Sequence, residues 1–247
     1  MKKTLGKIVF SSIGALWFGL AGPLPAQTGP FIFDNSVNDL NSRFSTINYQ
    51  VGDEITLAGT ARHMTHFDFE YSDTGNNLTT FAGDVQAPVR FYLNDGTPVR
   101  GYTSPGTLLW DSGWILNSRE LYPLVPTDEH PYRRTIDFTG ADSPDGAPLF
   151  IPADSMTWTT QFRGTVPGTD DLGVDRYLLP VASGEVGDFG DYWQNDGMGW
   201  DLLTNGAAKI DFGARMYATI AEPSAAALSI LGGLGVLIAL RRFRRKE

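Results

Sequence analysis

The sequence predicts an all-β protein, with an antiparallel, two-sheet, jelly-roll-like sandwich over residues 27–218. The first observation behind this prediction is a period of two, in which apolar residues alternate with polar ones. The clearest run covers residues 208–218, where Lys209, Asp211 and Arg215 fall on the polar face. Runs of the same period cover residues 85–93 and 156–162, and a less regular one covers residues 132–138. We therefore expect half-buried antiparallel strands.

The second observation is the chemistry of the segments between these runs. Each combines Asn, Asp or Ser with Gly, residues that tolerate the positive φ of tight turns. These segments are residues 94–96, 111–113, 143–146 and 195–197. No stretch within residues 27–218 has a convincing helical period, so we expect about eight to ten strands in the sandwich.

Length and cysteine content favour a single domain stabilised by its core. The chain has 247 residues, of which 42% are hydrophobic, and sandwiches of about 200 residues commonly form one domain. The Pro-, Gly- and Asp-rich residues 140–152 are the best internal break, yet they are short enough to be a loop. The chain contains no cysteine, which excludes disulfides, zinc thiolates and a thiol nucleophile.

Charge is segregated along the chain. Residues 27–222 carry 11 basic and 27 acidic side chains, a formal net charge of −16, and the other eight basic residues sit near the two termini. We therefore expect no nucleic acid partner, because nucleic acid binding depends on basic surface.

The N-terminus has the three parts of a secretory signal peptide, which we place at residues 1–26. Lys2, Lys3 and Lys7 form a basic region, and residues 8–20 form an apolar core. Helix breakers and a small residue then place the cut of signal peptidase between Ala26 and Gln27. A retained anchor or a buried helix is the alternative, but 13 apolar residues are short of the ~20 that span a bilayer.

The C-terminus, residues 219–247, predicts a single transmembrane helix with a fixed orientation. Glu222, Pro223 and Ser224 precede an apolar run over residues 225–240, which as a helix measures about 24 Å against a hydrocarbon core of about 30 Å. Insertion is therefore marginal. The basic residues at 241–246 favour the cytoplasmic side, so the sandwich lies outside the inner membrane. These basic residues are Arg241, Arg242, Arg244, Arg245 and Lys246.

This tail resembles the PEP-CTERM sorting signal of exported proteins in Gram-negative bacteria. The resemblance covers residues 221–247, and Ala221 stands where the family usually has Pro. It implies recognition and processing by exosortase, a membrane protease, with Glu222 and Pro223 as the matching Glu-Pro. It also implies anchoring in the inner membrane before processing, and then a place at the cell surface or in the extracellular matrix. A plain tail anchor is the alternative.

An aromatic and acidic cluster at residues 188–201 is the candidate glycan-binding site. Tyr192, Trp193 and Trp200 lie among carboxylates, amides and glycines, and sugars bind by stacking on aromatic rings and by hydrogen bonds to their hydroxyls. The alternative is that these rings plug one end of the sandwich. Trp110 and Trp114, in contrast, are expected in the core.

Calcium is the candidate cofactor. Asp170, Asp171 and Asp175 form a short acidic group, and calcium in extracellular modules takes carboxylate and carbonyl oxygens. Their spacing fits no defined calcium loop, and Asp is also a common turn residue, so a solvated loop is the alternative.

Catalytic motifs are absent from the sequence, so we expect no enzyme. His63 and His66 are three residues apart, which in a regular strand points them to opposite faces and prevents joint metal ligation. We favour a non-catalytic surface or matrix protein that binds polysaccharide. The alternative is a secreted carbohydrate-active hydrolase with a β-sandwich fold, which needs two carboxylates near each other in an open cleft.

Overall fold

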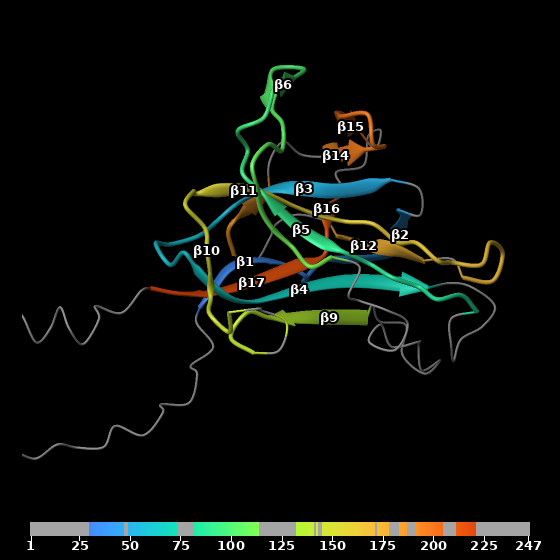
Figure 1. Cartoon of the computed structure of the whole chain (residues 1–247), viewed down its shortest axis with the longest axis horizontal. Helices are drawn as coiled ribbons and strands as arrows, with labels where there is room; N and C mark the ends of the chain where they lie inside the picture. Colours follow the sequence, from blue (N-terminus) through green and yellow to red (C-terminus); the bar gives the residue numbers. More distant parts are fainter. Residues whose placement is uncertain are drawn as a thin grey trace, which may run out of the picture.

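The computed structural model describes residues 30–46, 49–73, 82–113, 132–140, 142, 145–170, 172–177, 183–186, 191–204 and 211–220 (Figure 1). The predicted signal peptide, residues 221–247 of the predicted sorting tail, Asp171 and Trp114 lie outside these residues. Within them the structure is all-β, with antiparallel ladders throughout, as the sequence predicts. This described part has no helix that is long and apolar enough to cross a membrane.

The first sheet contains the two strands at the ends of the described chain. Its strands follow the order β1-β17-β4-β12-β16, with β9 and β10 also paired to β4 and β2 to β12. The bounds are β1 (Phe31–Asn35), β2 (Asp39–Ser45), β4 (His63–Asp73), β9 (Tyr132–Asp137), β10 (Leu149–Phe150), β12 (Leu172–Tyr177), β16 (Asp211–Phe212) and β17 (Ala214–Thr219).

The second sheet has the order β15-β14-β3-β11-β5-β8, with β13 also paired to β3. Its strands are β3 (Gln50–Thr56), β5 (Val89–Tyr92), β8 (Leu108–Asp111), β11 (Ser155–Thr160), β13 (Glu185–Val186), β14 (Asp191–Asn195) and β15 (Trp200–Thr204). A separate hairpin joins β6 (Pro98–Val99) to β7 (Tyr102–Thr103) and projects from the body of the molecule (Figure 1).

The two sheets pack face to face around an aromatic core, as in a β-sandwich. Trp158 on β11 is fully buried, and its ring lies 5.3 Å from the ring of Phe67 and 6.5 Å from that of Phe69, both on β4 of the other sheet. The predicted alternation of burial is confirmed in β17, where Ala214, Met216 and Ala218 are buried and the residues between them are half-buried. In the run 156–162 the predicted residues Met156, Trp158, Thr160 and Phe162 are buried, but Thr157 and Thr159 on the other face are buried as well. Trp110 is half-buried and packs against the core, with its ring 4.9 Å from Phe138.

The hairpin of β14 and β15 folds over the outer face of the second sheet. The ring of Trp200 on β15 lies 5.4 Å from that of Tyr92 on β5, although β14, β3 and β11 stand between these strands in the sheet order. Four strand spacings in a flat sheet would cover about 19 Å. The sheet must therefore curl at this edge, and β14 and β15 stand above β3 in Figure 1.

A β-bulge corrects the expectation that His63 and His66 point to opposite faces. The register between β17 and β4 shifts between the pairs Ala218↔Met64 and Tyr217↔His66, so Thr65 is the extra residue. Met64 and the residue after His66 are both buried in the core. Both histidines therefore point away from the core, where their rings contact Phe150 and Tyr217 respectively.

Candidate functional site

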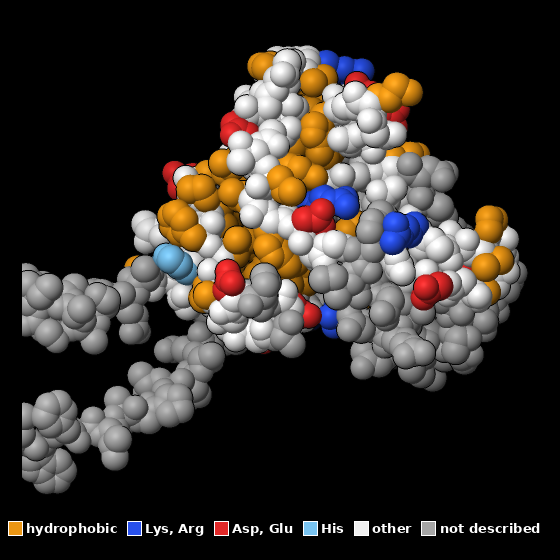
Figure 2. Space-filling view, viewed as in Figure 1, with side chains coloured by type: hydrophobic (Ala, Val, Ile, Leu, Met, Phe, Trp, Pro, Cys, Tyr) orange, Lys and Arg blue, Asp and Glu red, His pale blue; other side chains and the backbone are white. Residues whose placement is uncertain are grey.

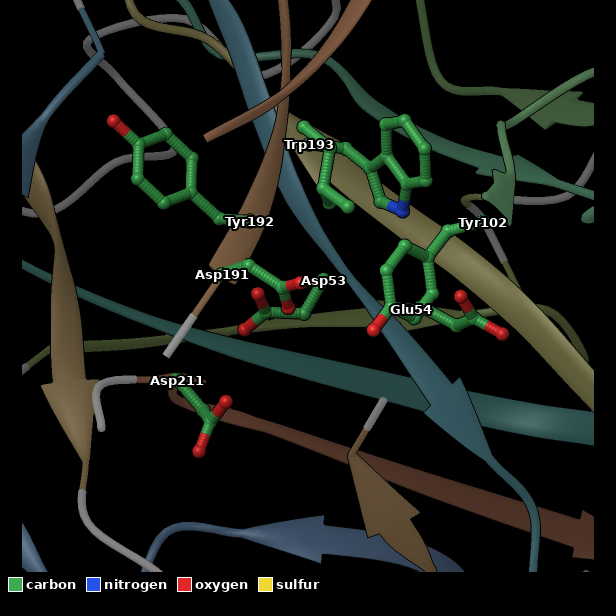
Figure 3. A pocket seen from close by; sticks show the side chains of 8 residues that line it. Asp53, Glu54, Tyr102, Asp191, Tyr192, Trp193 and Asp211 are labelled. Carbon is green, nitrogen blue, oxygen red and sulfur yellow. The ribbon is translucent and has the colours of Figure 1, made fainter. Parts of the chain in front are cut away.

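A small hollow lined by carboxylates lies at the edge of β3, and we call it the acidic hollow (Figure 3). The ladder of β13 reaches Ile55, and that of β14 begins at Gly52. Asp53 and Glu54 therefore lie at a break between two neighbouring strands. The described residues that line the hollow are Asp53, Glu54, Tyr102, Asp191, Tyr192, Trp193, Leu202 and Asp211.

Asp53 joins the two sheets at this break. It alternates along β3 with the fully buried Val51 and Ile55, so it faces the core, and only 3% of it is exposed. One of its carboxylate oxygens, Oδ2, accepts a hydrogen bond from the backbone N–H of Phe212, at 2.6 Å. Burial raises the pKa of Asp53 well above its usual value, and the nearby charge of Asp211 raises it further.

Asp211 is the second buried carboxyl of the hollow. It is 1% exposed, and its Oδ2 is buried without a hydrogen-bond partner. Burial, and then the charge of Asp191, raise the pKa of Asp211 to about 7. This position corrects the expectation that Asp211 lies on a solvated face with Arg215. The side chain of the next residue, Phe212, packs in the core and holds β16 beneath β3. Asp211 is therefore covered as well.

Glu54 and Asp191 form the outer side of the hollow. Continuing the register from Trp193↔Gly52 places Asp191 opposite Glu54 on neighbouring strands. Burial raises the pKa of Glu54, the charge of Asp191 raises it further, and a hydrogen bond with the Asn94 side chain acts in the opposite direction. The described lining contains four carboxyl groups and no lysine, arginine or histidine.

The size of the hollow limits its chemistry. It offers about 10 Å³ to the centre of a water-sized sphere, which is room for about one water molecule. A sugar ring does not fit. Among the described residues, no three His, Cys, Asp or Glu side chains form a group that could hold a metal ion. The arrangement as it stands suits the retention of a proton between Asp53 and Asp211, because two buried carboxyls in proximity resist joint ionisation.

The three aromatic residues predicted as a glycan site lie in different environments. Trp193 is 1% exposed, so the prediction of a sugar-stacking ring is wrong for this residue, which the fold-over of the hairpin covers. Tyr192 packs on the inner side, with its ring 4.8 Å from Phe44 and 6.0 Å from Phe212. Trp200 is half-buried against Tyr92. Trp200 is the member of the three that retains an outer position.

The three predicted calcium ligands do not share a described site. Asp170 is 2% exposed, and its carboxylate accepts hydrogen bonds from three backbone N–H groups. The donors are Ala82 at 2.7 Å, Gly83 at 2.9 Å and Val166 at 2.8 Å. The carboxylate therefore closes two loops on each other. Asp171 lies outside the described residues.

Asp175 faces a different part of the first sheet. Its Oδ1 accepts a hydrogen bond from the hydroxyl of Ser72 at 2.5 Å, and its Oδ2 is buried without a partner. Burial raises the pKa of Asp175 to about 7, and the hydrogen bond from Ser72 acts in the opposite direction. Asp170 and Asp175 thus contact different segments of the chain.

Sequence reasoning missed Asp53 and Asp211 as the centre of a candidate site. The sequence does carry a signal for Asp53. In the alternating run Val51, Asp53, Ile55, it stands at a position whose side chain faces the core. Asp211 gave no such signal, since its burial depends on strands that are remote in the sequence. No protein-family model, no curated protein and no solved structure matches this chain.

Proposed function

We propose that this chain is an exported, non-catalytic protein of the cell surface or extracellular matrix. In this proposal its jelly-roll-like sandwich is freed by an exosortase-type protease and lies in contact with extracellular polysaccharide. The observation that carries the proposal is the order of features after the sandwich: Glu222-Pro223-Ser224, then the apolar residues 225–240, then the basic residues 241–246.

The described fold is compatible with loss of this tail. The last strand, β17, ends at Thr219, and Ile220 is already 67% exposed. The buried core residues lie between Ile32 and Ala218. A cut near Glu222 therefore falls outside the described core, where a protease reaches the chain without unfolding the sandwich.

The acidic hollow is too small to serve as the cleft of a glycosidase. A glycosidase uses two carboxyl groups on either side of a bound sugar, whereas the carboxyls here surround a space that holds about one water molecule. Polysaccharide contact is supported instead by aromatic side chains around the folded-over hairpin. Tyr102 is 42% exposed, and the half-buried Trp200 packs edge-on against Tyr92.

The test compares three full-length proteins in a host that has the sorting machinery. Wild type should lose its tail and leave the inner membrane, because all the signal elements are present. The double variant Glu222→Ala, Pro223→Ala should stay full length in the membrane. A third form, with the five basic tail residues changed to Ser, should fail to be retained, because the charges that fix its orientation are gone.

Molecular mass and membrane fractionation report the outcome. A matched control, Glu185→Ala with Pro152→Ala, changes the same residue types within the sandwich and should be processed like wild type. If all proteins remain full length and membrane-bound, the tail is an ordinary anchor and the proposal is wrong.

A further inference from the structure

A group of apolar side chains lies at the end of the first sheet from which the chain continues into its tail. β1 begins at Phe31, β4 begins at His63 and β10 ends at Phe150. The pairs Phe31↔Tyr217, Thr219↔His63 and Phe150↔His63 place these strand ends beside one another. We call the group formed by Phe31, His63, Phe150, Tyr217 and Ile220 the strand-end patch.

The patch is exposed, and four of its members form ring pairs. Phe31 is 41%, Phe150 54% and Ile220 67% exposed. The ring of Phe31 lies 4.4 Å from that of Tyr217, and the ring of His63 lies 5.1 Å from that of Phe150. Figure 2 shows hydrophobic side chains around a histidine on the side of the molecule where β10 lies. Grouped exposed apolar side chains mark an interaction surface more often than isolated ones do.

The position of the patch along the chain indicates what it contacts. Ile220 lies five residues before Ala225, where the apolar run begins. An extended chain of five residues covers at most about 18 Å. If the apolar run spans the membrane, the end of β17 is held within that distance of the lipid surface, and no other end of the sandwich is held so closely.

We propose that the strand-end patch rests on the outer lipid surface of the inner membrane as long as the tail remains uncut. This inference rests on the proposed function, since the tail must insert for the patch to reach lipid. Aromatic side chains are favoured at the interface between headgroups and hydrocarbon. The sandwich is then docked in one orientation, with Glu222 close to the membrane where a membrane protease acts.

Charges beside the patch are compatible with this contact. Arg62 pairs with Asp154 at 2.6 Å, and His66 lies 3.4 Å from a carboxylate oxygen of Asp137. Two carboxylates beside the patch therefore face an arginine or a histidine, whereas Asp68 accepts a hydrogen bond from the hydroxyl of the patch residue Tyr217 at 3.5 Å. Residues 27–222 as a whole carry a net charge of −16. Neutral phosphatidylcholine is the suitable lipid for a test, because it adds no net charge of its own.

Single-cysteine labelling tests the inference on the full-length chain, which has no cysteine of its own. A fluorescent label is attached at Pro152→Cys beside the patch, at Met198→Cys on the β14–β15 turn, or at Gly233→Cys within the apolar run. Each protein is reconstituted in phosphatidylcholine vesicles. Quenching by an aqueous ion and by lipids with a quencher near the headgroup is then measured.

We expect the label at position 233 to be quenched by lipid, and the label at 152 to be several-fold less accessible to the aqueous quencher than that at 198. Phe31→Ser with Phe150→Ser should restore aqueous access at 152, whereas the control Val37→Ser with Val166→Ser should not. Circular dichroism checks that each variant is folded.

Three outcomes would overturn the inference. If position 233 contacts lipid but 152 and 198 are equally accessible, the patch does not dock, and the proposed function stands. If position 233 does not contact lipid, the tail does not insert, and the proposed function fails with the inference. If position 152 is protected equally without vesicles, in a manner that depends on protein concentration, the patch binds a second copy of the chain instead.

Discussion

Asp53 and Asp211 impose a pH dependence on the stability of the sandwich. The pKa of Asp211 rises from 3.8 to about 7 on folding, so the folded protein binds its proton more tightly than the unfolded chain does. Between about pH 4 and pH 7 the folded state holds more protons, and the free energy of unfolding falls as the pH rises. Below this window both states are protonated, and above it both are ionised.

We predict that Asp211→Asn flattens this dependence. The difference between 3.8 and about 7 corresponds to roughly 4 kcal/mol as an upper value. Asp53 still contributes, since its pKa is raised in the same direction. Urea unfolding at several pH values from 4 to 8 measures the slope, with the exposed Asp154→Asn as a control. An unchanged slope in Asp211→Asn would show that this carboxyl ionises freely in the folded protein.

Substitutions of Trp193 and Trp200 should distinguish a role in core packing from a role in polysaccharide binding. Trp193 is buried, so Trp193→Ala should lower the free energy of unfolding by about 3–5 kcal/mol. Trp200→Ala should cost less, because Trp200 is only half-buried, and it should weaken retention on extracellular polysaccharide. Urea unfolding and affinity electrophoresis provide the two measurements. Equal losses of stability would mean that both rings are core residues and that the glycan surface lies elsewhere.

At the scale of elements, the carboxylate of Asp170 connects two loops that are not joined by pairing of β-strands. Its carboxylate accepts N–H groups from Ala82, Gly83 and Val166. We predict that Asp170→Asn lowers the free energy of unfolding by about 2–3 kcal/mol, because an amide has one acceptor oxygen in place of two. Thermal unfolding measures the effect. Asp145→Asn, at an exposed turn residue, is the matched control, and an equal melting temperature for the two variants would contradict the prediction.

Some strands were predictable from a period of two in the sequence, although β4, the longest described strand, was not among the predicted runs. The alternation of β17 was visible in the sequence because one face of this strand lies in the core. In β11 both faces are buried, and the period is visible because Met156 and Trp158 alternate with threonines. The described residues form 17 strands, more than the eight to ten expected, and five of these strands, β6, β7, β10, β13 and β16, have only two residues each. Two residues cannot show a period, and such strands form because longer neighbours bring them into register.

Irregular pairing explains the remaining errors about the site. The bulge at Thr65 places His63 and His66 on one face, which a regular period of two excludes. The fold-over of β14 and β15 buries Trp193, although its acidic and glycine-rich surroundings in the sequence suggested exposure. Both features depend on how strands that are distant in the sequence pair and pack, so they cannot be recognised from local sequence patterns.

At the scale of the whole molecule, the described core is formed without any residue after Ile220. The buried residues of the core lie between Ile32 and Ala218, so we predict that a chain of residues 27–220 unfolds in one cooperative transition. Its melting temperature should match that of the sandwich in the full-length protein held in detergent micelles. Scanning calorimetry makes the comparison. A clearly lower value for the shorter chain would show that residues after 220 contribute to folding.

The pairing of β1 with β17 also determines how the sandwich responds to mechanical load. These antiparallel strands hold the first and last described segments side by side, so the chain enters and leaves the sandwich at the same end (Figure 1). A force that pulls these two points apart acts across the ladder and opens its hydrogen bonds one after another, like a zipper. Such loading requires little force, whereas shear along the strands would break many bonds at once. A protein built in this way suits attachment at a single point, and not a position as a link between two anchored structures.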